Sequence, residues 1–162
     1  MYKKKIISSI IITLLLFSTI FITGCMEDGE ESPKGVIKAM IEDMNDEDFR
    51  DALNHTDLKF NKTLYNHMLE NFEENDPNKM EINEITVKNK EDMNESLKEN
   101  VQDNIPMLEE NLSVEVDDFR SLKVNMTNTD EDKTEENTFI ALKIDSEWYI
   151  SFYLLLSVED AG

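Results

Sequence analysis

Apolar residues recur at helical spacing in the segment that begins at residue 32. Ser32 suits the N-cap of a helix, and Pro33 suits its first position. The apolar side chains that follow fall on one helical face, at Val36, Ile37, Met40, Ile41 and Met44. The pattern therefore predicts a helix over Pro33–Met44.

Three further helical segments are expected. A short helix carries Phe49, Ala52 and Leu53. A longer one runs from about residue 61 to residue 75, where apolar residues step by four and Pro77 then ends the helix. A fourth pattern covers residues 97–112, and Pro106 within it predicts either two shorter helices or one kinked helix.

Strand patterns occupy much of the remaining chain. Residues 80–88 predict a strand with a bulge after Ile82, where the alternation breaks. Residues 122–126 alternate as in a half-buried strand, whereas residues 129–137 carry no apolar side chain and predict a charged loop. Two final strands, Phe139–Ile144 and Trp148–Leu156, flank a turn. The last one is so apolar that we expect it in the centre of a sheet, covered on both faces.

This order of elements predicts an α+β fold, with N-terminal helices packed on a curved antiparallel sheet. Three segments carry a resemblance to the cystatin-like, or NTF2-like, small domains of prokaryotic surface lipoproteins: the helix pair 33–53, the charged hairpin 129–137 and the closing residues 143–150. The resemblance implies a cone-shaped cavity between helix and sheet. In some relatives that cavity is an active site, in others it is a ligand pocket, and in many it is filled by side chains, so the fold alone does not give the function.

The N-terminus has the order of a secretory signal. Lysines at positions 3–5 precede the apolar run Ile6–Ile22, and small residues precede the only cysteine, Cys25. The ending Ile22-Thr23-Gly24-Cys25 resembles a lipobox, in which the thiol takes a lipid and the leader is removed. This resemblance implies a signal peptide over 1–24, cleavage after Gly24, and a protein held by Cys25 on the outer face of the cell membrane. The alternative is an uncleaved anchor, because the apolar run lies near the lower length limit for a bilayer helix.

The remaining chain then divides into a polar tether (25–32), one domain (33–158) and a short tail (159–162). The whole chain has a formal net charge of −20, and the part after the leader, without its three lysines, has −23. Such a surface repels phosphates, which excludes nucleic acid as a partner. It favours solubility, or else a cation or a cationic partner. With Cys25 used as the anchor, no thiol is left for a disulfide, a redox pair or a zinc site.

No set of residues indicates catalysis, a metal or a cofactor. His55 and His67 are too far apart for two ligands on one helical turn, and we expect His55 to end the short helix and His67 to lie on a polar helix flank. Residues 128–132 supply alternating oxygens like the start of a calcium loop. Lys133 and Phe139, however, stand where an EF-hand needs glycine and glutamate.

Aromatic side chains of the predicted last strand are the candidates for lining a pocket. Tyr149 and Tyr153 share one of its faces, and Trp148 and Phe152 share the other. A hollow cone with one buried carboxylate near either tyrosine would favour a pocket enzyme of the isomerase or hydrolase type. A cone filled by the aromatic side chains and by the first helix would favour an interaction module.

We therefore expect a membrane-anchored, non-enzymatic module that binds a small apolar ligand or another envelope protein. The alternatives are the pocket enzyme and a cation-responsive acidic surface module. Five sequons, which mark glycosylation sites in some exported proteins, begin at Asn54, Asn61, Asn94, Asn111 and Asn125.

Overall fold

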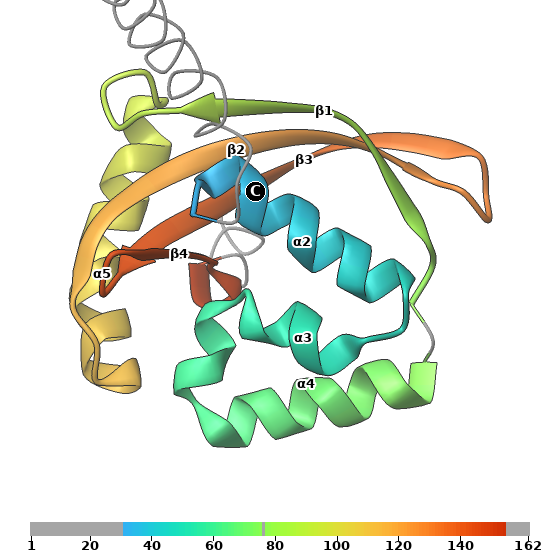
Figure 1. Cartoon of the computed structure of the whole chain (residues 1–162). Helices are drawn as coiled ribbons and strands as arrows, with labels where there is room; N and C mark the ends of the chain where they lie inside the picture. Colours follow the sequence, from blue (N-terminus) through green and yellow to red (C-terminus); the bar gives the residue numbers. More distant parts are fainter. Residues whose placement is uncertain (1–30, 76, 155–162) are drawn as a thin grey trace, which may run out of the picture.

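The structure, a computed structural model, describes residues 31–75 and 77–154 (Figure 1). The predicted signal peptide with its cleavage after Gly24, the lipidation site Cys25, most of the tether, and everything predicted for residues 155–162 lie outside these ranges. Within them, no helix is both long enough and apolar enough to cross a bilayer.

The N-terminal half forms the predicted helices. These are α2 (Pro33–Asn45), α3 (Phe49–Asn54) and α4 (Lys62–Asn75), with a 3₁₀ turn η1 (Asp57–Phe60) before α4. The Ser32 hydroxyl accepts a hydrogen bond of 3.0 Å from the amide of Gly35, so the predicted N-cap of α2 is confirmed. The sequence pattern did not predict η1, which begins where the Thr56 hydroxyl accepts from the amide of Leu58.

A four-stranded antiparallel sheet follows, in the order β1 (Met80–Lys88), β2 (Val116–Asn128), β3 (Lys133–Ile144) and β4 (Glu147–Ile150). Its register shifts between Ile82 and Glu84, which confirms the predicted bulge. The predicted α+β fold is also confirmed. Figure 1 shows the long strands β2 and β3 curving over α2.

The predicted charged loop 129–137 is wrong over its second half. Strand β3 begins at Lys133, and its polar residues pair across to β2. The Lys123 ammonium donates to Glu136 at 2.7 Å, and the Thr127 and Thr134 hydroxyls lie 2.8 Å apart. This end of the hairpin forms a strand without apolar side chains because its backbone pairs with β2 while polar residues face water.

The predicted central strand Trp148–Leu156 is also wrong. β4 stops at Ile150 and lies at the edge of the sheet, beyond β3. Phe152–Leu154 then form a helical turn. The Ser151 amide still donates to the Ile140 carbonyl of β3 at 2.8 Å. The chain leaves the sheet at Phe152, whose amide donates to the buried Asp57 at 2.9 Å instead.

The helical segment before β2 is one helix, α5 (Glu95–Leu112), which continues through Pro106. Of the two predicted alternatives, this excludes two shorter helices. The helix packs on the sheet face opposite α2. Along the strands, buried side chains point to the two faces of the sheet in turn. Leu122 and Ala141 pack on the α2 side, whereas Phe119 and Leu142 pack on the α5 side. Figure 1 shows the two helices separated by the sheet.

The space between α2 and the sheet is filled. Ile37 is 0 % exposed and Ile41 9 %, and both pack with Ala141 and Ile150 in one apolar cluster. Trp148 and Phe152 are partly buried against the same cluster. Of the two alternatives left open by the sequence, a hollow or a filled cone, this side of the sheet corresponds to the filled one.

Candidate functional site

An open groove lies where the start of α2 meets the turn between β3 and β4. Its volume is about 770 Å³, and its lining includes His55, Lys59, Lys143, Trp148 and Tyr149. The groove therefore combines two of the predicted pocket residues, Trp148 and Tyr149, with cationic side chains that the sequence had not singled out.

The turn at the rim of this groove has an unusual backbone for its residues. Asp145 and Ser146 both adopt positive φ, 51° and 72°. Two such residues in succession make the type I′ turn that matches the twist of a two-stranded hairpin. The Ser146 amide also donates to the Asp117 carboxylate at 3.3 Å, which holds the turn against the start of β2.

Tyr149 lies at the centre of a short polar chain in the groove. The Lys59 ammonium donates to the Tyr149 hydroxyl at 2.7 Å, and that hydroxyl donates to the Glu147 carboxylate. The Phe60 ring packs edge-on against the Tyr149 ring, with centroids 5.2 Å apart. Burial, and then Glu147, raises the pKa of Tyr149 above its usual value, so its hydroxyl remains a neutral hydrogen-bond donor rather than a base.

Trp148 forms the other aromatic wall, and cations lie near its ring. The Arg120 guanidinium is 5.6 Å and the Lys143 ammonium 5.9 Å from the ring centroid, within the range of cation–π contacts. Arg120 also pairs with Asp118 at 2.5 Å. Although burial raises the pKa of Asp118, hydrogen bonds from Lys90 and Arg120 bring it below its usual value, so this carboxylate stays charged and fixes both cations.

Phe152 and Tyr153, the other two predicted pocket residues, do not line this groove. They stand in the turn after β4, so the four aromatic side chains do not share the faces of one strand, contrary to the prediction. The Tyr153 hydroxyl accepts a hydrogen bond of 3.1 Å from the Asn61 amide, and Phe152 packs against the core. Both residues join the C-terminal turn to the helical half of the domain.

Asp57 is a buried acid that the sequence pattern did not predict. Its exposure is 0 %, yet its carboxylate has two partners: the Ser151 hydroxyl donates at 2.6 Å and the Phe152 amide at 2.9 Å. Burial raises the pKa of Asp57 to about 6, and these hydrogen bonds oppose the rise. A signal was present only at Ser151, which interrupts the apolar run after Trp148, whereas Asp57 lies in a largely polar segment.

This carboxylate lies outside three surface grooves of the described residues. They are the groove at Trp148 and two others of about 630 and 490 Å³, and Asp57 lines none of them. Its oxygens are already bonded to buried groups. The arrangement is therefore a structural link between η1 and the residues after β4.

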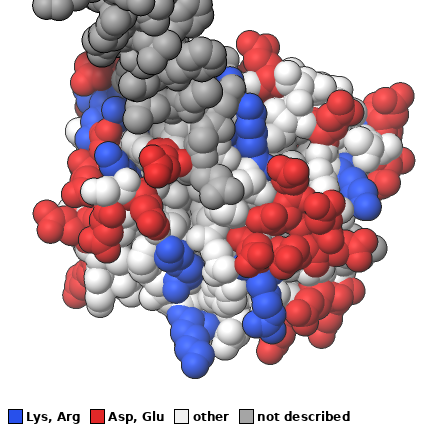
Figure 2. All heavy atoms as spheres, viewed as in Figure 1, with Lys and Arg blue, Asp and Glu red and all other residues white. Residues whose placement is uncertain are grey.

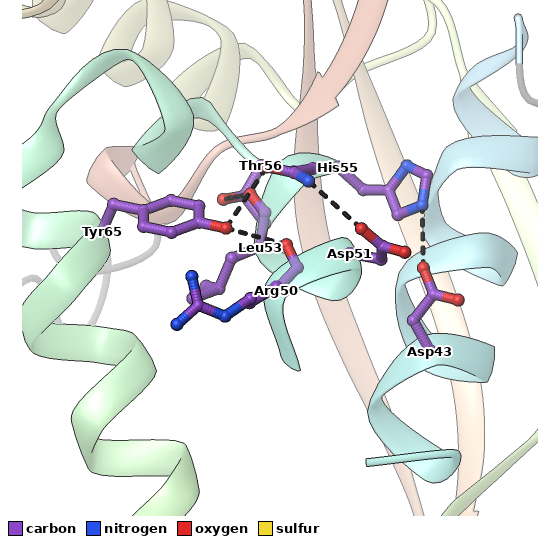
Figure 3. A network of polar contacts seen from close by, with 8 residues as sticks. Asp43, Arg50, Asp51, Leu53, His55, Thr56 and Tyr65 are labelled. Carbon is purple, nitrogen blue, oxygen red and sulfur yellow. Dashed lines mark hydrogen bonds and ion pairs between the residues drawn. The ribbon is translucent and has the colours of Figure 1, made fainter. Parts of the chain in front are cut away.

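His55 has a structural place as well. It forms the C-cap of α3, as predicted, and its Nε2 lies 3.0 Å from the Asp43 carboxylate on α2. Figure 3 shows this contact beside a second set, in which the Tyr65 hydroxyl of α4 donates to the carbonyl of Arg50 at 2.9 Å. Burial raises the pKa of Asp43, and the contact with His55 opposes that rise. The network fastens α3 to both neighbouring helices. His67 is exposed on α4, as predicted.

The acidic loop after β2 is organised by its own hydrogen bonds. The Asn128 side chain accepts from the amides of Asp130 and Glu131, at 3.0 and 3.2 Å, and Asp130 accepts from the amide of Lys79 at 3.2 Å. Among residues 31–75 and 77–154, no group of three or more His, Cys, Asp or Glu side chains is arranged to hold a metal ion.

The five sequon asparagines lie at the surface or partly exposed. Four already have structural partners. Asn61 bonds to Tyr153, Asn94 caps α5, and Asn125 accepts from Asn83 at 3.0 Å. The Asn54 side chain donates to Asp51 at 3.4 Å and accepts from the Tyr65 hydroxyl at 3.3 Å. Asn111 is exposed on α5, and Asn54 is exposed at the end of α3. Glycosylation at these positions remains a prediction.

The resemblance to cystatin-like or NTF2-like lipoprotein domains also remains a prediction. No family model matches the sequence, and neither a curated protein nor a solved structure is significantly similar to it.

Proposed function

We propose that the protein is a non-enzymatic binding module, held on the outer face of the cell membrane by a lipid on Cys25. The filled interior is the observation that carries this proposal. Ile37 and Ile150, both 0 % exposed, occupy the space where a catalytic cone would lie. Recognition is then left to the surface, and the groove beside Trp148 and Tyr149 offers aromatic area together with charged groups.

Asp57 is the one feature that favours the alternative, a pocket enzyme. It is a buried carboxylate that lies close to the backbone of Tyr153, although the two residues are far apart in the sequence. A pocket enzyme would need such a carboxylate near a tyrosine. Its hydrogen bonds to Ser151 and Phe152 and its place outside the grooves weigh against that role. An acid that acts on a substrate must reach it within hydrogen-bond distance.

The anchor is tested on the full chain expressed in a host that lipidates exported proteins. We expect mass spectrometry to find a mature N-terminus at Cys25 that carries a lipid, and we expect the protein in the membrane fraction. Cys25→Ser should be recovered as uncleaved precursor or as released protein. An intact leader with a free thiol on the wild-type chain would contradict the proposal.

The binding role is tested by a photoreactive residue in the groove. Placed at Ser146, on the exposed turn at the rim, it should capture the ligand or envelope partner in intact cells. The matched control carries the same residue at Thr134, on the exposed end of the β2–β3 hairpin. Equal labelling from both positions would show that the groove is not the binding surface.

A further inference from the structure

The tether limits how far the domain can move from its anchor. Five residues, 26–30, separate Cys25 from Glu31, the first residue that the structure describes. A chain of this length spans at most about 20 Å, even when fully extended. If Cys25 carries a lipid, as proposed above, the surface around Glu31 lies within that distance of the membrane.

Trp148 lies at this end of the domain. Glu31 and Trp148 together line the 770 Å³ groove and also a second groove of about 490 Å³, which lies between the start of α2 and strand β1. Four basic residues accompany them. Lys59 and Lys143 line the first groove, Lys34 lines the second, and Arg120 lies over the Trp148 ring. We call these four residues and Trp148 the Trp148 face.

Acidic residues are also present there. Glu31, Asp145 and Glu147 line the first groove, Asp118 pairs with Arg120 at 2.5 Å, and Asp117 accepts from the Ser146 amide. The Trp148 face with these acids is therefore close to neutral, although the whole chain carries 36 acidic and only 16 basic residues. A neutral region on so acidic a protein is the part that an anionic surface repels least.

The other end of α2 has the opposite character. This helix has 13 residues and is about 20 Å long at 1.5 Å per residue. Between residues 42 and 51 the chain has one basic residue, Arg50, and six acids: Glu42, Asp43, Asp46, Glu47, Asp48 and Asp51. Figure 2 shows acidic side chains gathered on the side of the molecule where α2 ends and α4 lies.

We propose that the anchored domain rests on an anionic lipid surface with its Trp148 face toward the headgroups and the acidic end of α2 directed away. The lipid on Cys25 attaches the domain to the membrane, so the electrostatic interactions need only determine which face of the domain is turned toward the headgroups. Indole rings and the long stems of lysine and arginine suit the headgroup region, because each combines an apolar body with a polar or charged end. Headgroup phosphates attract Lys59, Lys143 and their neighbours and repel the acids of residues 42–51.

Trp148 is the only tryptophan of the chain, so its fluorescence reports on this face alone. The experiment uses the full lipidated chain on phosphatidylcholine vesicles, with or without phosphatidylglycerol, and quenches the indole with uncharged acrylamide. We expect quenching to fall at least twofold on the anionic vesicles. High salt should restore much of it, because screening weakens attraction between exposed charges and headgroups.

Charge reversal at the two groove lysines, K59E with K143E, should abolish this protection, and K59Q with K143Q should weaken it. The matched control reverses two lysines on the hairpin, K123E with K133E, and should leave the protection intact. Circular dichroism and urea unfolding show that each variant is folded. Equal quenching of the wild-type chain on both vesicle types overturns the proposed orientation, and so does an equal effect of the two charge reversals. A chain that floats with neither vesicle type overturns the lipid anchor itself, which is a distinct result.

Discussion

The Ser151 hydroxyl donates a hydrogen bond of 2.6 Å to the Asp57 carboxylate, across 94 positions of sequence. Both residues are fully buried. The same Ser151 hydroxyl accepts from the amide of Leu154 at 3.2 Å, so Asp57 also steadies the turn that follows β4. This pair joins the helical half of the domain to the end of the sheet.

Replacement of Asp57 by alanine should destabilise the domain by about 2–4 kcal/mol, because the Ser151 hydroxyl and the Phe152 amide would remain buried without an acceptor. The free energy of unfolding is measured by urea denaturation followed by circular dichroism. Glu70→Ala, at an exposed position of α4, is the control and should change stability by less than about 0.5 kcal/mol. A loss that small in Asp57→Ala would show that the buried link contributes little.

Asp57 should also make stability depend on pH. Its pKa is about 6 in the folded protein against a usual 3.8, so the folded state holds the proton more tightly than the unfolded chain. The stabilisation is complete below pH 3.8 and is lost as the pH rises through about 6. The difference corresponds to about 3 kcal/mol, at 1.36 kcal/mol for each pKa unit.

The measurement is urea unfolding at a series of pH values from 4 to 8, with Asp57→Asn as the control. Repulsion among the other carboxylates also grows with pH, and it acts on both proteins alike. The wild-type chain should therefore lose more stability than the variant between pH 4 and pH 7. Parallel pH profiles would mean that Asp57 titrates at its ordinary pKa.

The helices were predictable because their signals are local. Ser32, Pro33 and the spacing of apolar residues after them determine the start and the buried face of α2 without reference to the rest of the chain. The bulge in β1 was predictable for the same reason, since it breaks the alternation at Ile82.

The errors arose where distant residues decide the structure. The apolar run after Trp148 reads as one strand, yet β4 ends at Ile150, and the amide of Phe152 donates to the distant Asp57 rather than to the sheet. Residues 133–137 read as a loop because they lack apolar side chains, but pairing with β2 makes them a strand. Within the groove, Trp148 and Tyr149 were predicted as aromatic candidates, whereas Lys59 reaches Tyr149 only through the fold.

Trp148→Ala should cost about 1–3 kcal/mol of stability, less than the loss of a fully buried tryptophan. The indole is only partly buried against the cluster under α2, and part of its contact is with the cations Arg120 and Lys143. Trp148→Phe, which keeps an aromatic ring, should lose less than half as much. Unfolding is followed by circular dichroism because the fluorescent residue is removed. A loss above about 4 kcal/mol would place the indole in the core and leave little of it to face a membrane.

Pro106→Ala should stabilise the domain by about 1–3 kcal/mol, since proline inside a helix removes one backbone hydrogen bond and crowds the preceding turn. Pro106 is exposed, and α5 continues through it, so alanine requires no repacking. Glu110→Ala, exposed on the same helix, is the control and should stay within about 0.5 kcal/mol of the wild-type chain. The urea midpoint should rise with an unchanged slope. A lower midpoint would show instead that the path imposed by Pro106 is needed to seat Val101 and Leu108, the buried residues on either side of it, against the sheet.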